Sequence, residues 1–486
     1  MRDKLFKKRP IEILGKTGKQ ISRIGLILGP LLFLITISVP VDDLTFEGKV
    51  VLGAAIWMAI WWVTEAVPLY VAALLPIVLF PAMQVIPLSD TATNYAHRLV
   101  FLLLGGFIIA KAIQKTNLHE RFALTTLKII PNGSPKLIIF AFMIITASIS
   151  AWMCNTATTL MILPIALAVI SQVKKTEDRN LFGSRLMISI AFAASIGGIA
   201  TLVGTPPNVI CSSIADKMFD IDINFSIWMM IGVPVSIISL IIAGLYLTNV
   251  GFRMSSTNII DEKDVIVKKL KALGTITRDQ KLVLAVFAST AIAWVSHVAW
   301  KPYFPMIDDS VIAIIAAMSF FVLPSKENGR ILSKDEGIRI PWGVLLLIGG
   351  GLALAAGFTA TGVDQWMASQ LTFLENFPPF VIVLVLVVVA VIATQFIVNT
   401  ATAALLIPVA AALSSVLSMD PLLFMIPVAI ATSYGFILPV GTPPNIVILG
   451  SGYVTPKQLA KVGLPLTLIL MAVLTILMIT LVPAVF

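Results

Sequence analysis

The chain has 486 residues, of which 58% are hydrophobic and 12% charged, and its formal net charge is +9. Soluble proteins usually carry about 25% charged residues, so this composition excludes an ordinary soluble protein and indicates one that lies within a bilayer. The two cysteines, Cys154 and Cys211, both lie in apolar surroundings, which disfavours a disulfide framework.

Apolar stretches long enough to span a bilayer, roughly 20 residues each, recur along the chain. The sequence predicts them near residues 24–41, 50–64, 68–86, 99–113, 226–249, 282–300, 308–323, 342–358 and 463–485. Longer apolar stretches with polar interruptions occupy residues 137–172, 186–215, 379–417 and 421–451. No small-residue cleavage site is evident after the first stretch, so it is interpreted as a membrane helix rather than a cleaved signal. The predicted fold is therefore an all-α polytopic membrane protein.

The basic residues are distributed unevenly between the predicted loops. If the first helix leaves the cytoplasm and the stretches at 186–215 and 421–451 each cross once, 30 of the 34 Lys and Arg residues lie on the cytoplasmic side. The positive-inside rule then predicts a multi-pass protein of the inner or plasma membrane, with a cytoplasmic N-terminus and an extracellular C-terminus. Basic loops beside anionic lipid explain this charge better than a nucleic-acid surface, so no nucleic-acid partner is expected.

Two short motifs of the first half recur in the second half. They are Cys-Asn-Thr-Ala-Thr at 154–158 against Val-Asn-Thr-Ala-Thr at 398–402, and Gly-Thr-Pro-Pro-Asn at both 204–208 and 441–445. The loop after the first motif holds four basic residues at 174–185, whereas its counterpart at 414–421 holds none. By the orientation above these loops face opposite sides, so the halves are predicted to be inverted repeats with one shared site.

Each motif is a polar break in an apolar stretch, where backbone groups are free to meet a solute. Asn and Thr favour N-cap positions, and Thr205 and Thr442 each precede a proline suited to the first helical position. Four helix N-termini are therefore expected to converge, an arrangement that favours an anion. The Asn oxygens and freed carbonyls resemble sodium ligands, so a neighbouring cation site stays open.

No Lys, Arg, Asp or Glu lies within the four motifs. Amides, hydroxyls and dipoles alone would meet the anion, which suits a carrier that must release its cargo. The absence disfavours a cation/proton antiporter, because proton relays use embedded carboxylates or histidines. An enzyme with Cys154 as nucleophile is also disfavoured, because no base lies near it in the sequence. We therefore expect a carrier rather than an enzyme, with no cofactor apart from an open question of sodium coupling.

The paired motifs and their inverted arrangement resemble the divalent anion/sodium symporter family of di- and tricarboxylate carriers, over about residues 24–485. The resemblance implies about eleven membrane helices, two re-entrant hairpins, a homodimer and an elevator motion. It implies C4 or C5 dicarboxylate substrates such as succinate, malate, fumarate or 2-oxoglutarate. The expected substrate-binding residues are Asn155, Thr156, Thr205, Pro206, Asn399, Thr400, Thr442 and Pro443. A cation site would involve Cys154, Asn155, Gly204, Val398, Asn399 and Gly441.

The resemblance also implies a division of the chain. The expected parts are a basic cytoplasmic segment at 1–23, scaffold helices at 24–98, a first transport part at 99–225, scaffold helices at 226–341 with a cytoplasmic loop at 251–281, a second transport part at 342–458 and a C-terminal helix at 459–486. The transport parts contain hairpins at 137–172 and 379–417 and broken helices at 186–215 and 421–451. Each hairpin arm of about 17 residues would measure about 25 Å, short of a roughly 30 Å core, so re-entrant hairpins are favoured over paired full crossings.

The chain departs from the family pattern at both hairpin tips. Family members carry Ser-Asn-Thr there, whereas this chain has Cys154 and Val398 at the serine positions. Thr201 likewise matches Leu438 in the other half, which removes a second hydroxyl. These losses favour sodium-independent exchange of dicarboxylates, and sodium-coupled symport of di- or tricarboxylates is the alternative.

Overall fold

The computed structural model describes residues 15–129, 134–173, 176–250, 263–326, 329–370 and 372–486. Residues 1–14 of the basic segment predicted at 1–23 lie outside the described residues, as do residues 251–262 of the predicted cytoplasmic loop.

Helices form the regular structure of the first half. In chain order they are α2 (Gly15–Ser38), α3 (Phe46–Thr64), α4 (Leu69–Ala72), α5 (Leu75–Ala82), α6 (Leu88–Thr93), η2 (Asn94–Ala96), α7 (Arg98–Lys115), α8 (Leu118–Ile129), α9 (Pro135–Ser150), α10 (Asn155–Ile170), α11 (Thr176–Gly198), α12 (Pro206–Phe219), α13 (Phe225–Leu245) and η3 (Tyr246–Val250).

The second half adds one short antiparallel pair of strands to a further series of helices. Its elements are α14 (Lys263–Ala272), α15 (Arg278–Val295), α16 (His297–Trp300), α17 (Asp309–Val322), β1 (Pro324–Ser325), β2 (Gly329–Arg330), α18 (Lys334–Ile338), α19 (Trp342–Thr361), α20 (Val363–Ser369), η4 (Thr372–Asn376), α21 (Pro379–Phe396), α22 (Asn399–Val416), α23 (Leu422–Ala431), α24 (Pro443–Leu449) and α25 (Pro456–Val485).

The helices confirm the predicted all-α polytopic fold. Within the described residues, nine helices are long and apolar enough to cross a membrane. Both arms of the second hairpin, α21 and α22, are among them at 18 residues each, whereas α9 and α10 of the first hairpin have 16 residues each. Helix length therefore leaves the choice between re-entrant hairpins and full crossings as a prediction.

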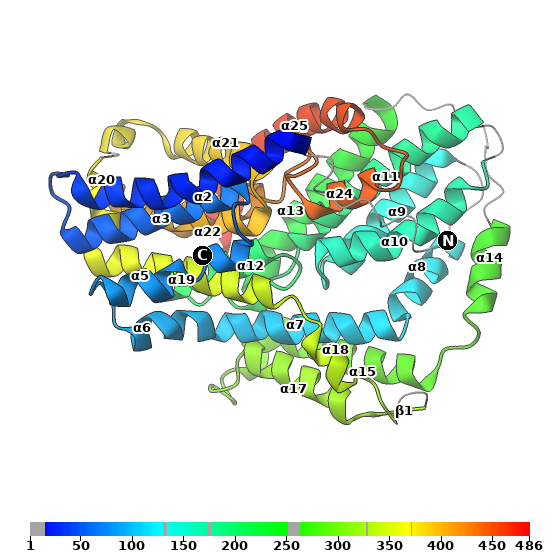
Figure 1. Ribbon diagram of the computed structural model, residues 1–486. Coiled ribbons are helices and arrows are strands. Elements are labelled where there is room, and N and C mark those ends of the chain that lie inside the picture. Colours follow the sequence, from blue (N-terminus) through cyan, green and yellow to red (C-terminus); the bar gives the residue numbers. More distant parts are fainter. Residues whose placement is uncertain (1–14, 130–133, 174–175, 251–262, 327–328, 371) are drawn as a thin grey trace.

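The two halves of the chain are interlocked rather than laid side by side. Helix α10 of the first hairpin packs against α24, and α22 of the second hairpin packs against α12. In Figure 1 the two hairpins lie apart, α9 and α10 on the right and α21 and α22 left of the middle, with α12 and α24 between them. The first break, residues 199–205, separates α11 from α12, and the second break, residues 432–442, separates α23 from α24. Each hairpin thus contacts the helix that follows the break of the other half, as a shared site between repeats requires.

Helix α11 is enclosed by α9, α10, α13 and α24, and 94% of its most apolar stretch is buried. Small residues allow other helices to approach its backbone closely, which is how membrane helices pack in the absence of a hydrophobic driving force. At Gly197 an added Cβ would overlap the Ala147 backbone of α9. The first hairpin is therefore pressed against the helix that leads into the first break.

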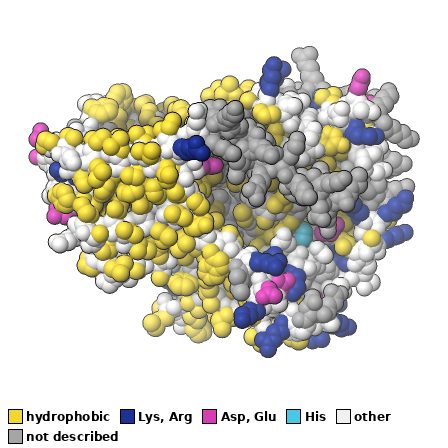
Figure 2. All heavy atoms as spheres, in the orientation of Figure 1, with side chains coloured by type: hydrophobic (Ala, Val, Ile, Leu, Met, Phe, Trp, Pro, Cys, Tyr) yellow, Lys and Arg dark blue, Asp and Glu magenta, His cyan; other side chains and the backbone are white. Residues whose placement is uncertain are grey.

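The outer surface divides into an apolar part and charged ends. Large apolar side chains of α2 are exposed, Ile27 at 70% among them, as expected for a helix that faces lipid. Figure 2 shows hydrophobic side chains over the left part of one face, around α2 and α3, while Lys and Arg gather mainly toward the right. Which of these ends faces the cytoplasm stays a prediction.

An ion-pair cluster fixes the end of α12 to neighbouring segments. Arg98, at the start of α7, lies 3.0 Å from Asp216 and 2.9 Å from Asp222, and Lys301 lies 2.8 Å from Asp222. Burial raises the pKa of the Asp222 carboxyl, but hydrogen bonds from Lys301 and Arg98 outweigh burial and hold that pKa below its usual range. Arg98 and Lys301, two of the four basic residues predicted on the outer side, thus meet in one place.

Replacing Gly197 by Ala is expected to destabilise the protein by about 1–3 kcal/mol, because the new methyl group must push the α9 backbone away. Thermal unfolding of the purified protein in detergent measures the effect. Gly106→Ala is the matched control, since its Cβ would meet only the Val203 side chain, at 3.3 Å. Equal melting temperatures for the two variants would contradict this account of the α9–α11 contact.

Candidate functional site

The hairpin tips place Cys154 and Val398 at the N-cap positions of α10 and α22. Asn155 and Asn399 are the first helical residues, so the expected capping by Asn or Thr side chains is wrong for these tips. The backbone carbonyls of Cys154 and Val398 accept the first helical hydrogen bonds of α10 and α22, but neither side chain makes a cap hydrogen bond. The first amides of both helices are therefore left without a side-chain acceptor, which suits an anion from solution.

The Asn155 side chain ties the first hairpin tip to the break beside it. With its NH2 group as donor, the amide reaches Ser150 Oγ at 2.9 Å, Ala194 O at 3.1 Å and Gly204 O at 3.3 Å. The hydroxyl of Ser150 in turn donates to Ala194 O at 2.7 Å. This amide orientation is assigned because only acceptors surround the nitrogen position.

Asn399 makes the same connections in the second half. Its NH2 group reaches Gly441 O at 2.8 Å and both Thr394 Oγ1 and Thr432 O at 3.1 Å. The hydroxyl of Thr394 donates to Thr432 O at 2.7 Å. In both halves the amide nitrogen is committed to protein acceptors, and the Oδ1 oxygen is the candidate atom for contact with a solute.

Ser150 and Thr394 are site residues that the sequence interpretation missed. Each is fully buried and lies five residues before the tip Asn. A signal was present, because the two hydroxyl residues match at the same 244-residue offset as Asn155 and Asn399. Their hydroxyl oxygens add to the neutral oxygens gathered at each tip.

The last Asn of each Gly-Thr-Pro-Pro-Asn motif holds the unwound backbone in place. Asn208 Nδ2 donates to Gly198 O at 3.0 Å and Thr201 O at 2.7 Å. Asn445 Nδ2 donates to Gly435 O at 2.8 Å and to Leu438 O at 3.0 Å, which are the matching positions of the other half. Both Asn side chains are fully buried, so their role is structural.

Helix α13 satisfies further carbonyls in the first break and at the end of α11. Trp228 Nε1 donates to Ile199 O at 2.9 Å, and Ser236 Oγ donates to Ile196 O at 2.9 Å. Unpaired backbone groups are costly at membrane depth, so this pairing is what allows the helix to stop there. The sequence analysis expected these carbonyls to be available to a cation. Many of them instead accept hydrogen bonds from protein donors.

Thr205 and Thr442 occupy N-cap positions, with Pro206 and Pro443 at the first helical position, as predicted. Neither Thr side chain makes a cap hydrogen bond. The two prolines of each motif have no N–H, and the following Asn N–H donates back to the Thr carbonyl. The four expected N-termini are therefore unequal, because α10 and α22 keep amide donors whereas α12 and α24 contribute mainly their dipoles.

The motif residues differ in exposure, because some are half-buried and others are fully enclosed. Thr156 and Thr400 are half-buried, and their hydroxyls make no hydrogen bond within the described residues. Pro206 and Pro443 are also half-buried, whereas Thr205 and Thr442 are buried. Cys154 is a free, half-buried cysteine at the first tip.

The mismatch between Thr201 and Leu438 has a structural explanation. The Thr201 hydroxyl donates to the Ala151 carbonyl, so it links the first break to the first hairpin. In the second half this link is made by another side chain, Gln395, whose Oε1 accepts from the backbone of Leu438. The absence of a hydroxyl at Leu438 is therefore no evidence that the second half has lost a cation site.

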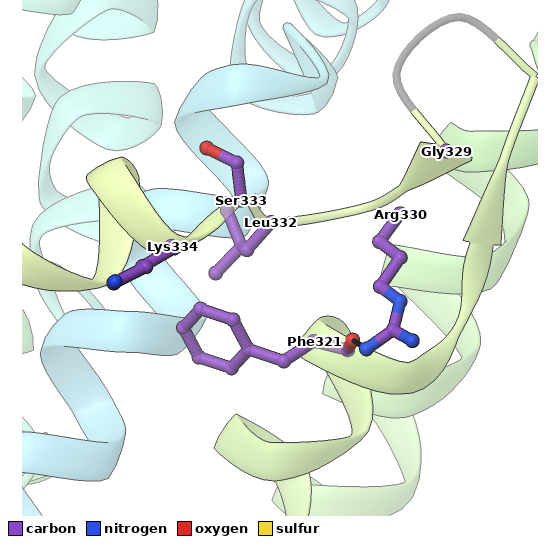
Figure 3. Close-up of a pocket in the computed structure, with 6 residues that line it drawn as sticks. All are labelled: Phe321, Gly329, Arg330, Leu332, Ser333 and Lys334. Atoms are coloured by element: carbon purple, nitrogen blue, oxygen red, sulfur yellow. Dashed lines mark hydrogen bonds between the residues drawn. The ribbon is translucent and has the colours of Figure 1, made fainter.

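A surface pocket of about 620 Å³ lies elsewhere, beside β2 and α18. Its lining consists of Phe321, Gly329, Arg330, Leu332, Ser333 and Lys334. Figure 3 shows the Arg330 guanidinium turned back onto Phe321, where Nη1 donates to the backbone carbonyl at 2.9 Å. None of these residues belongs to the four motifs, so this pocket is separate from the candidate site.

Comparisons with known proteins agree with the family indicated by the motifs. Residues 21–485 match the family model described as the sodium:sulfate symporter transmembrane region. The "sodium-dependent dicarboxylate transporter SdcS" of Staphylococcus saprophyticus is 36% identical over 476 residues, which cover 95% of this chain and 92% of that protein. The protein of the same name from Staphylococcus aureus is 38% identical over 461 residues, covering 92% and 88%.

A solved structure supports the fold alone. The crystal structure of the Alcanivorax borkumensis YdaH transporter aligns with a TM-score of 0.55 at 12% sequence identity. The alignment covers 80% of this chain and 86% of that one. The likeness is consistent with an all-α polytopic membrane protein.

Replacing Asn445 by Ala is expected to cost about 1–3 kcal/mol of stability, because two buried carbonyls lose their donor. Thr400→Ala removes a hydroxyl that has no protein partner and should leave the melting temperature unchanged. Thermal unfolding of both purified variants makes the comparison. A Thr400 variant as unstable as the Asn445 variant would contradict the conclusion that Asn445 holds the backbone in place whereas the Thr400 hydroxyl does not.

Proposed function

The chain belongs to the divalent anion/sodium symporter family, and from this premise we propose that it is a sodium-coupled carrier of C4 and C5 dicarboxylates. The family and the relatives are transporters, so the chain is a membrane transporter and no enzyme. Succinate, malate, fumarate and 2-oxoglutarate are the proposed substrates. The names of the two relatives support both the substrate class and the sodium dependence.

The duplicated hairpin tip is the observation that carries this proposal. Each tip offers uncapped backbone amides and one unpaired Thr hydroxyl, Thr156 in one half and Thr400 in the other. Two matched sets of donors fit a ligand that has a carboxylate at each end. Pro206 and Pro443 lie at the N-termini of α12 and α24, whose dipoles add a favourable field for the anion.

Sodium ions would supply the positive charge that the side chains of the four motifs lack. A dicarboxylate brings two negative charges, and no Lys or Arg belongs to the four motifs. An anion buried without a compensating charge is costly in a low-dielectric interior. Sodium ions held by the Oδ1 atoms of Asn155 and Asn399, with Ser150 and Thr394 hydroxyls nearby, would supply that compensation.

Exchange without sodium becomes the second candidate. Its basis in the sequence was the loss of oxygens at Val398 and Leu438, but Asn399 and Thr394 keep their oxygens in that half. The Cys154 and Val398 side chains also match in making no cap contact, so Val398 loses no bond that Cys154 makes. Sodium-coupled symport is therefore preferred here.

The larger movements belong to the same proposal. The crosswise packing of α10 on α24 and α22 on α12 connects the two halves, which supports their movement as one body. We envisage a homodimer in which this unit travels through a scaffold by an elevator motion, with re-entrant hairpins and a cytoplasmic N-terminus. The scaffold helices would include α2, α3, α15 and α17.

Uptake into proteoliposomes tests the coupling. Labelled succinate should accumulate in vesicles without internal dicarboxylate when an inward sodium gradient is imposed, and replacement of sodium by choline should abolish accumulation. The physical reason is that the dianion then lacks its compensating charge. Uptake that ignores sodium and requires internal dicarboxylate would favour exchange instead.

Thiol labelling tests the location of the site. Cys154 is half-buried at the first tip, whereas Cys211 is fully buried, so a small polar thiol reagent should modify Cys154 and block uptake. Sodium and succinate together should slow this labelling severalfold by covering the tip. Cys154→Ser is the control and should resist the reagent. Labelling at an unchanged rate with both solutes present would remove Cys154 from the vicinity of the substrate.

A further inference from the structure

Each hairpin is hydrogen-bonded at three points to the segment beside it, which consists of the break and the end of the helix before it. Two of the three ties use the same chemistry in both halves, through the tip Asn amides and through the hydroxyls of Ser150 and Thr394. The third tie is made at Ala151 in the first half and at Gln395 in the second, between the other two along the hairpin. This middle tie differs between the halves. This difference identifies a residue that lies outside the four motifs.

In the first half the middle tie runs from the break to the hairpin. The Thr201 hydroxyl donates to the Ala151 carbonyl, which lies directly after α9. The break concerned is short, covering residues 199–205. One hydroxyl and one backbone carbonyl are enough to close it against the hairpin.

In the second half the middle tie runs the other way, from the hairpin to the break. The Gln395 side chain is 4% exposed, and its Nε2 donates to Tyr434 O at 3.2 Å. Its Oε1 accepts from Ile437 N at 3.0 Å and from Leu438 N at 3.3 Å. The side chain thus acts as an inserted peptide group that satisfies three backbone groups of the break.

The two ties occupy equivalent positions. Ala151 matches Gln395 at an offset of 244 residues, and Thr201 matches Leu438 at 237, the offsets of their respective motifs. Where the break carries a hydroxyl the hairpin has Ala, and where the break carries Leu the hairpin has Gln. The second break, residues 432–442, is also longer and leaves more backbone to satisfy.

Gln395 lies directly against the candidate ion site. A Cβ added at Gly441 would stand 3.0 Å from Thr394 O and 3.4 Å from Gln395 Cα, so the two backbones are in contact. The Gly441 carbonyl accepts from Asn399, whose Oδ1 is the oxygen left for a cation. Any shift of the break therefore changes the distance between the oxygens of this half-site.

We propose that Gln395 is a positioning residue that holds the second break in register and thereby sets the sodium affinity of the half-site around Asn399. The inference rests on the proposed sodium-coupled function. It assigns to Gln395 and Leu438 the part that Ala151 and Thr201 perform in the first half. Gln395 itself touches no solute, because its polar atoms are occupied by protein groups.

Two variants test the proposal. Gln395→Met keeps most of the side-chain volume and removes the hydrogen bonds, and Gln395→Ala with Leu438→Thr transplants the tie of the first half. We expect Gln395→Met to raise the sodium concentration for half-maximal succinate uptake by about tenfold, the factor that corresponds to about 1.4 kcal/mol. The succinate concentration for half-maximal uptake, measured at saturating sodium, should change less than about twofold. The double variant should return sodium half-saturation to within about threefold of the starting protein.

Gln395→Ala alone and Leu438→Thr alone are the controls. The first should resemble Gln395→Met, and the second should resemble the unmodified protein because Gln395 still holds the break. A purely packing role predicts equal damage in Gln395→Ala and in the double variant, and that result would overturn the proposal. Unchanged sodium half-saturation in Gln395→Met would overturn it as well.

Hydrogen exchange separates failure of this inference from failure of the proposed function. Peptides covering residues 432–442 should exchange faster in Gln395→Met and return to the original rate in the double variant, whatever the protein transports. If the unmodified protein shows no sodium-dependent uptake, the proposed function fails, and the exchange rates still decide whether Gln395 holds the break. Unchanged exchange in Gln395→Met contradicts the positioning role directly.

Discussion

Unwound backbone at membrane depth must find its hydrogen bonds within the protein, and the architecture around the site follows from that constraint. Asn155 and Asn399 hold the tips to the breaks, and Asn208 and Asn445 hold the breaks to themselves. Trp228 and other side chains of α13 complete the first break. Because these side chains are buried and polar, they specify one arrangement of four chain segments that apolar packing alone would leave loose.

The same constraint decides which atoms remain for chemistry. Amide nitrogens of the tip Asn residues are used within the protein, so their oxygens, the uncapped amides of α10 and α22, and the Thr156 and Thr400 hydroxyls are the candidate groups for contact with a solute. These groups are neutral. Under the proposed function, a dianion and its cations would compensate each other's charge, and a site whose four motifs carry no charged side chain would empty again once the cations leave, as a carrier requires.

The sequence predicted the positions of the breaks, their duplication and the prolines at the starts of α12 and α24, because these depend on local backbone preferences and on periodicity. It did not predict that Cys154 and Val398 would occupy the N-caps, or that Gln395 would replace Thr201, because both depend on which distant segment comes within hydrogen-bonding reach. The Ser150 and Thr394 pair lay between these cases. Its matched offset was visible, but its meaning required the neighbouring carbonyls of Ala194 and Thr432.

The proposed function requires cations to supply the positive charge that the four motifs lack. Calorimetric titration of succinate into the purified protein, in sodium and then in choline buffers of equal ionic strength, tests it without any transport step. The account predicts measurable binding in sodium and affinity at least about tenfold weaker in choline, a difference of about 1.4 kcal/mol or more. Equal affinity in the two buffers would contradict it.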